Sequence, residues 1–289
     1  MPSFLARGLL AAALSLAASV RAEPTPTTPA AAGATTLRFV RDGHVVATLD
    51  LPALREACRT EVVEIDDPYY QARKTFQACP LRRVLELGFG STDAIAGEDV
   101  LLRARDGYVK PAAGSRLLEE GAYLAYADAQ LTGDGPPRWA PIDRRQVDPA
   151  PYYLVWTKPA QRDPHRYPWP YQLVTIEVAS IEAVYPHIAP RSAPTGSPAW
   201  AGFAIFRTEC IACHAINGEG GTVGPDLNVP QSIVEYRPVG QIKAYVRDPA
   251  TFRYGAMPAH PHLTDRQLDE LIAYFTAMKD LKHDPRRAP

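Results

Sequence analysis

The chain has 289 residues, of which 46% are hydrophobic and 22% are charged, so it is long enough to form two globular domains. Its 31 Lys and Arg residues nearly balance its 32 Asp and Glu residues, which excludes the strongly basic surface of a nucleic-acid-binding protein. The 29 prolines are about twice the number that the ~5% average usage gives, and they indicate many turns and linkers.

The first 22 residues predict export. A largely apolar run over residues 8–20 follows Arg7, and Ala22 closes a segment with small residues at the positions that a signal peptidase reads. We expect cleavage after residue 22 and a periplasmic mature protein, with an uncleaved anchor as the alternative. No later stretch approaches the ~20 apolar residues of a membrane span, so no transmembrane segment is expected in the mature chain.

A proline-containing linker over residues 23–35 is expected to lead into an α+β or mostly-β domain over residues 36–185. Asp42-Gly43 between two alternating runs predicts a β-hairpin over residues 36–49. Short helices are expected to have Pro52 and Pro80 in their first turns, with Gly88 after the second. Further strands are expected at residues 61–65, 100–104, 123–127, 152–156 and 172–178.

The segments Cys79-Pro80-Leu81-Arg82-Arg83-Val84-Leu85 and Asp106-Gly107-Tyr108 resemble the molybdopterin-binding fold of sulfite oxidase. That family ligates molybdenum through a cysteine in a Cys-Ala-Gly-Asn-like setting. Neither Cys58 nor Cys79 stands in such a setting, so the resemblance implies a relative without the cofactor that serves as a docking or scaffold module.

Two further features of this region have two interpretations each. In an exported protein, Cys58 and Cys79 form a disulfide or remain as two separate buried thiols. Trp156 and the run Tyr167-Pro168-Trp169-Pro170-Tyr171 are interpreted as buried packing, with a partner-binding patch as the alternative.

A second proline-rich linker over residues 186–198 precedes a helical domain over residues 199–285. This domain contains a C-x-x-C-H pattern, Cys210-Ile211-Ala212-Cys213-His214. In such a pattern the two thiols form thioether bonds to the haem vinyl groups, and the histidine ligates the iron. Zinc would need two more ligands, and a redox dithiol would not need the histidine. The pattern predicts one covalently bound haem c.

The domain resembles class I cytochrome c across its whole length. The matching features are the helix with Gly202 and Phe206, the C-x-x-C-H pattern, the Gly-Pro-Asp-Leu loop over residues 224–227, Met257-Pro258 and a closing helix. Thr264 and Gln267 form a capping box at the start of that closing helix. The resemblance implies an all-α cytochrome c fold. It implies that the first and last helices cross at Gly202 and Tyr274, and that the Pro225 carbonyl accepts a hydrogen bond from His214.

The second axial ligand of the iron is predicted to be Met257, because a thioether favours the ferrous state and the mature chain has only one other methionine, Met278. Met278 lies on the apolar face of the closing helix and is interpreted as core. His260 and His262 are the rival ligands, in a stretch that looks like a solvated loop. The remaining histidines, His165 among them, are interpreted as surface or hydrogen-bonded residues.

Apolar residues between the ligands are expected to shield the haem from water: Val223, Leu227, Ile233, Tyr236, Ile242, Tyr245, Val246, Phe252 and Tyr254. Together these features predict an exported monohaem cytochrome that passes single electrons between periplasmic redox proteins and is not itself an enzyme. One alternative is a molybdopterin-dependent oxidoreductase that passes its electrons out through haem c. The other is a haem enzyme whose iron has an open coordination position.

Overall fold

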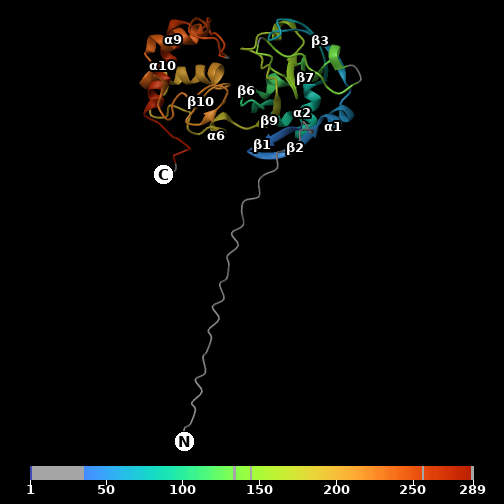
Figure 1. Cartoon of the computed structure of the whole chain (residues 1–289), viewed down its shortest axis with the longest axis horizontal. Coiled ribbons are helices and arrows are strands. Elements are labelled where there is room, and N and C mark those ends of the chain that lie inside the picture. Colours follow the sequence, from blue (N-terminus) through green and yellow to red (C-terminus); the bar gives the residue numbers. More distant parts are fainter. Residues whose placement is uncertain (2–35, 133–134, 144, 256, 288–289) are drawn as a thin grey trace. The chain divides into compact units, whose positions relative to one another are not determined.

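The computed structural model describes residues 1, 36–132, 135–143, 145–255 and 257–287. The predicted signal peptide and the linker that follows it therefore lie outside the described residues, apart from Met1. Figure 1 shows a sheet-rich N-terminal region followed by a helical C-terminal region. Among the described residues, no helix combines the length and the apolarity needed to cross a bilayer.

The first sheet has the strand order β2-β1-β9-β5-β6. The predicted hairpin is confirmed as β1 (Thr36–Arg41) and β2 (His44–Asp50), with Asp42 and Gly43 both at positive φ in the turn. Strand β9 (Leu173–Val178) lies parallel to β1 and antiparallel to β5 (Asp99–Ala104). Strand β6 (Val109–Ala113) forms the edge beside β5.

The second sheet is antiparallel, with the order β3-β4-β7-β8. Its strands are β3 (Glu61–Asp67), β4 (Ala72–Pro80), β7 (Ala122–Asp128) and β8 (Tyr153–Trp156). Every strand expected from the sequence is present, whereas β4 and β6 were not predicted.

The helices of this region are short: α1 (Leu51–Ala57), α2 (Leu81–Phe89), α3 (Asp93–Ala96), α4 (Gly114–Leu117), α5 (Ala129–Thr132), η1 (Pro159–Gln161) and α6 (Ile181–Val184). The predicted end of α2 was wrong, because Gly88 lies inside the helix and Gly90, at φ 79°, caps it. A Cβ on Gly88 would overlap the Phe39 ring, so close packing explains this glycine. Pro80 stands at the N-cap of α2, one position before its first turn.

The aromatic run packs inside the sheet-rich region, as interpreted from the sequence. Trp156 and Trp169 are each 1% exposed. Their indole N–H groups donate to the carbonyl oxygens of Pro168 and Gln161, at 2.7 and 3.1 Å. A buried indole needs such a partner, so both rings are fixed as core anchors. Nearby, a disulfide joins Cys58, which follows α1, to Cys79 of β4, with their Cα atoms 6.1 Å apart.

The C-terminal region contains α7 (Pro198–Ile205), a π-helical turn η2 (Phe206–Cys210), α8 (Ile233–Tyr236), α9 (Val239–Arg247), η3 (Pro249–Thr251) and α10 (Asp265–Lys279). The strands β10 (Ala215–Ile216) and β11 (Glu219–Gly220) form a small ladder. The capping box of Thr264 and Gln267 at the start of α10 is confirmed.

Helix α10 crosses α7 at Gly202. A Cβ on Gly202 would overlap the Glu270 carbonyl oxygen and would lie 2.8 Å from Tyr274 Cβ. The Tyr274 ring packs 5.3 Å from the Phe206 ring, centroid to centroid. The close approach of these two helices therefore depends on a glycine at this position.

The two regions share a hydrophobic core. Leu101 of β5 and Val109 of β6 pack in one cluster with Phe206 and Ile211. The backbone N–H of Val109 donates to Ala212 O at 2.9 Å, and that of Thr222 donates to Gly107 O at 3.0 Å. The described residues from 36 onward accordingly form one compact unit, in which the turn between β5 and β6 supports the segment around Cys213.

Candidate functional site

The segment Cys210–His214 begins where the π-helical turn ends. The wider turn is marked by the hydrogen bond from Ile211 N to Phe206 O, at 2.9 Å, and His214 N then donates to Cys210 O at 2.9 Å. Such π turns are rare and occur often at functional sites. The side chains of Cys210, Cys213 and His214 all line one cavity of about 660 Å³, a volume within the range of cofactor pockets.

The His214 ring is fixed from two sides. Its Nδ1 lies 2.8 Å from the Pro225 carbonyl oxygen, so Nδ1–H donates and Nε2 keeps its lone pair. On the other side, a Cβ on Gly224 would lie 2.7 Å from His214 Nδ1, so only glycine leaves room for the ring. Burial lowers the pKa of His214, and the neutral imidazole is the form that ligates a metal.

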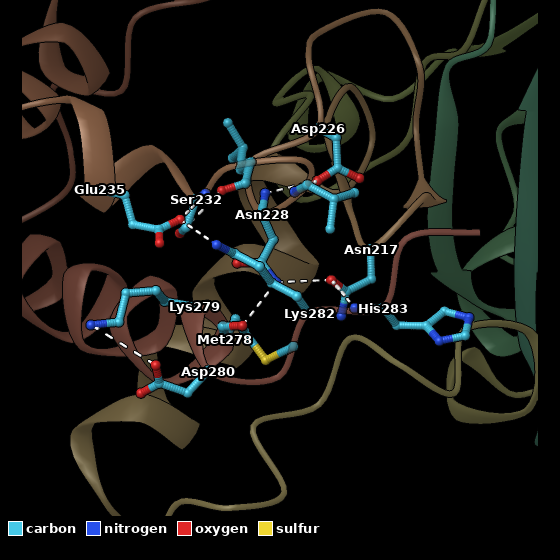
Figure 2. A network of polar contacts seen from close by, with 12 residues as sticks. Asn217, Asp226, Asn228, Ser232, Glu235, Met278, Lys279, Asp280, Lys282 and His283 are labelled. Atoms are coloured by element: carbon cyan, nitrogen blue, oxygen red, sulfur yellow. Dashed lines mark hydrogen bonds and ion pairs between the residues drawn. The ribbon is translucent and has the colours of Figure 1, made fainter. Parts of the chain in front are cut away.

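A buried polar network holds the loop that carries Pro225 (Figure 2). Asp226 Oδ1 accepts the backbone N–H groups of Asn228 and Val229, at 2.7 and 2.9 Å. Asn228 Nδ2 then donates to Asn217 Oδ1 and to the Met278 carbonyl oxygen, both at 2.8 Å. The position of the Pro225 carbonyl is thereby tied to the end of α10.

The two free thiols have the wrong electrostatics for a redox dithiol. Burial raises the pKa of Cys210 to about 12 and that of Cys213 to about 11. A reactive C-x-x-C thiol needs a lowered pKa, because the thiolate is the nucleophile. Thioether sulfurs carry no proton and tolerate an apolar site, so this environment fits covalent attachment to haem.

Met257 lines the same cavity as His214 and packs against the cluster around Ile242 and Val246. Met278 is 1% exposed in the core beneath α7, away from the cavity lining. All nine apolar residues expected to wall the haem line the cavity: Val223, Leu227, Ile233, Tyr236, Ile242, Tyr245, Val246, Phe252 and Tyr254. The structure thus places both predicted axial ligands on one largely apolar cavity that fits the haem.

The interpretation of residues 259–262 as a solvated loop was wrong for His260, which is 5% exposed and reaches the cavity lining. His260 lies beside Glu209, together with His262 and with His165 from the sheet-rich region. Burial alone would raise the pKa of Glu209, but these imidazoles lower it to about 2. The sequence gives no signal for this group, because His165 and Glu209 are far apart in the chain.

Replacing Gly224 tests the fit around His214. We expect Gly224→Ala to displace the His214 ring and to lower the free energy of unfolding of the haem-loaded protein by about 1–3 kcal/mol, the usual cost of overpacking. Urea denaturation followed at the Soret band measures this difference. Gly97→Ala is the control, because a Cβ there meets nothing within 4 Å. Equal loss in both variants would contradict the prediction.

Comparisons with known proteins agree with this geometry over the C-terminal region. Residues 199–279 match the family model for cytochrome c. The chain is 32% identical over 93 residues to cytochrome c oxidase subunit 2 of Alkalihalophilus pseudofirmus, a match that covers 30% of this chain and 27% of the relative. It is 39% identical over 84 residues to lupanine 17-hydroxylase (cytochrome c) of a Pseudomonas species, covering 28% of this chain and 11% of that protein.

The family match does not extend to residues 36–185, and the expected sulfite oxidase-like fold is not supported there. Both cysteines of that region are joined in the disulfide, so neither is a free thiolate for molybdenum. Residues 199–279 are therefore a cytochrome c domain, and the chain carries covalently bound haem c.

Proposed function

We propose that this chain is an exported c-type cytochrome that passes single electrons between periplasmic redox proteins and performs no bond chemistry itself. The observation that carries the proposal is the placement of Cys210, Cys213, His214 and Met257 on one cavity with apolar walls. A haem c held there supplies one-electron chemistry, and a second axial ligand from the protein keeps small molecules off the iron.

The residues of the chain have separate tasks in this function. Cys210 and Cys213 hold the porphyrin covalently, and His214 and Met257 are the proposed axial ligands. The Pro225 carbonyl accepts the Nδ1–H of His214, which orients the ring and raises the basicity of Nε2. Apolar walls around a bound haem would limit its contact with water, which would disfavour the extra charge of the oxidised state and raise the reduction potential.

We assign residues 36–185 the role of a scaffold and docking module. The backbone bonds from Val109 to Ala212 and between Thr222 and Gly107 support this role, because they brace the haem-attachment segment. Lys110 adds a hydrogen bond from Nζ to Thr208 O at 3.0 Å. Export is supported by the apolar run at residues 8–20 and by the disulfide, since disulfides persist in oxidising compartments.

The axial ligands are tested by absorption spectroscopy of the haem-loaded protein in both oxidation states, with carbon monoxide added to the reduced form. We expect a low-spin spectrum, a methionine–iron charge-transfer band and no carbon monoxide adduct. Met257→Ala is expected to lose the band and to bind carbon monoxide, because the position that the thioether fills is then open.

Met278→Leu is the matched control, because Met278 is the other methionine of the helical region and lies in the core. It should keep the band and exclude carbon monoxide. A high-spin spectrum with ready carbon monoxide binding by the unmodified protein would instead indicate an enzyme with an open iron. A band that persists in Met257→Ala would rule out Met257 as the ligand.

A further inference from the structure

Four side chains that could ligate a metal converge beside the haem cavity. Glu209 lies in the last turn of η2, directly before Cys210. His260 and His262 follow Met257 in the loop before α10, and His165 comes from the loop after η1 in the sheet-rich region. One ligand atom from each of the four lies within 4.8 Å of the others.

The spacing around the carboxylate matches that of a tetrahedral metal site. Glu209 Oε2 lies 3.0 Å from His165 Nδ1, 3.4 Å from His260 Nδ1 and 3.4 Å from His262 Nε2. Nitrogen and oxygen ligands at 2.0–2.2 Å from a tetrahedral zinc ion lie about 3.3–3.5 Å apart. The ligand atoms lie within 4.8 Å of one another, so the imidazole nitrogens need to approach one another by about 1.5 Å at most to complete such a shell.

The buried member of the group supplies an independent argument. His260 is 5% exposed, and within the part of the chain that the structure describes its Nδ1 has no hydrogen-bond partner. Leaving a buried polar atom unpaired costs about 1–3 kcal/mol. The atom faces Glu209 Oε2 and lies within reach of the two other imidazoles, so a shared cation would satisfy it.

The ligand chemistry selects the class of metal. Three imidazoles and one carboxylate suit a divalent first-row transition metal, whereas calcium and magnesium prefer oxygen ligands alone. Zinc binds both imidazole nitrogen and carboxylate oxygen, and it is four-coordinate and tetrahedral in closed structural sites. We propose that His165, Glu209, His260 and His262 form a structural zinc site.

Such a site would act as a clamp. It would join the loop at His165 to the residue that precedes the haem-attachment cysteine and to the loop that carries Met257. Because Met257 lies three residues before His260, the clamp would limit the motion of this proposed axial ligand. Metal bound only to the folded state also stabilises it, by an amount that rises with the metal concentration.

The test uses the full-length, haem-loaded protein with any affinity tag removed, stripped with a chelator and then titrated with zinc in a calorimeter. We expect one zinc ion per chain. His165→Ala and Glu209→Gln should each weaken zinc binding about 100-fold or more, since even substitutions outside the ligand shell cost about 10–100-fold. X-ray absorption at the zinc edge should show nitrogen and oxygen neighbours with imidazole scattering.

His187→Ala is the matched control, because His187 also pairs with a glutamate, Glu219, through Nδ1 at 2.5 Å but lies outside the group. This variant should bind zinc as the unmodified protein does. His165 is 46% exposed, so its replacement leaves the fold intact. Equal zinc binding in all four proteins, no binding in the unmodified protein, or sulfur neighbours at the zinc edge would each overturn the proposal.

Discussion

We expect Gly202→Ala to lower the free energy of unfolding of the haem-loaded protein by about 2 kcal/mol or more. Alanine favours a helix by about 1 kcal/mol over glycine, so propensity alone predicts the opposite sign. The added Cβ would overlap the Glu270 carbonyl oxygen, which belongs to the backbone of α10 and cannot rotate away. The two helices must then separate, and overpacking of this kind costs about 1–3 kcal/mol and sometimes more.

The loss of packing should extend along the interface between α7 and α10, because the Tyr274 ring contacts the rings of both Phe203 and Phe206, at 5.6 and 5.3 Å between centroids. Urea denaturation followed by Soret circular dichroism measures the loss. Gly240→Ala in α9 is the control, since a Cβ there meets nothing within 4 Å, and it should leave stability unchanged or slightly raised. If Gly202→Ala matched the control, close helix crossing would not be the reason for this glycine.

The local patterns of the sheet-rich region predicted most of its strands, and the two misses have physical causes. Strand β6 contains Pro111, which argues against a strand in a sequence, yet β6 lies at the edge of its sheet, where a missing N–H donor is tolerated. Strand β4 has a bulge between Gln77 and Ala78, so its alternation of buried and exposed residues is interrupted. Neither the sheet edge nor the bulge can be read from local periodicity.

The residues of the candidate site also divide into those that a local sequence pattern predicts and those that it does not. The C-x-x-C-H pattern, the Gly-Pro loop and Met257 are local signals whose chemistry requires those residue types, and they lie on one cavity. The cluster around Glu209 depends on tertiary packing, because His165 comes from a distant loop. His260 lies between Ala259 and Pro261 in a stretch that indicates exposure, yet its side chain is buried. Its backbone N–H donates to Val246 O at 3.1 Å, a contact with α9 that the local sequence does not indicate.

Loss of the Cys58–Cys79 disulfide should cost the sheet-rich region about 3 kcal/mol. The bond joins residues 21 positions apart, and closing a loop of this size removes that much conformational entropy from the unfolded chain. In the folded chain it fixes the end of α1 to β4, where both cysteines are buried at 5% and 1% exposure. We expect dithiothreitol to lower the urea midpoint, measured by far-ultraviolet circular dichroism.

The double variant Cys58→Ala/Cys79→Ala separates the disulfide from other effects of the reductant. It should unfold at a lower urea concentration than the unmodified protein and should show no further change with dithiothreitol, because the thioether bonds to haem are not disulfides. If dithiothreitol left the urea midpoint of the unmodified protein unchanged, the disulfide would contribute nothing to its stability. A large decrease in the urea midpoint would show that the stability of the sheet-rich region depends on the oxidised state of Cys58 and Cys79. Such a dependence suits a protein that folds in an oxidising compartment.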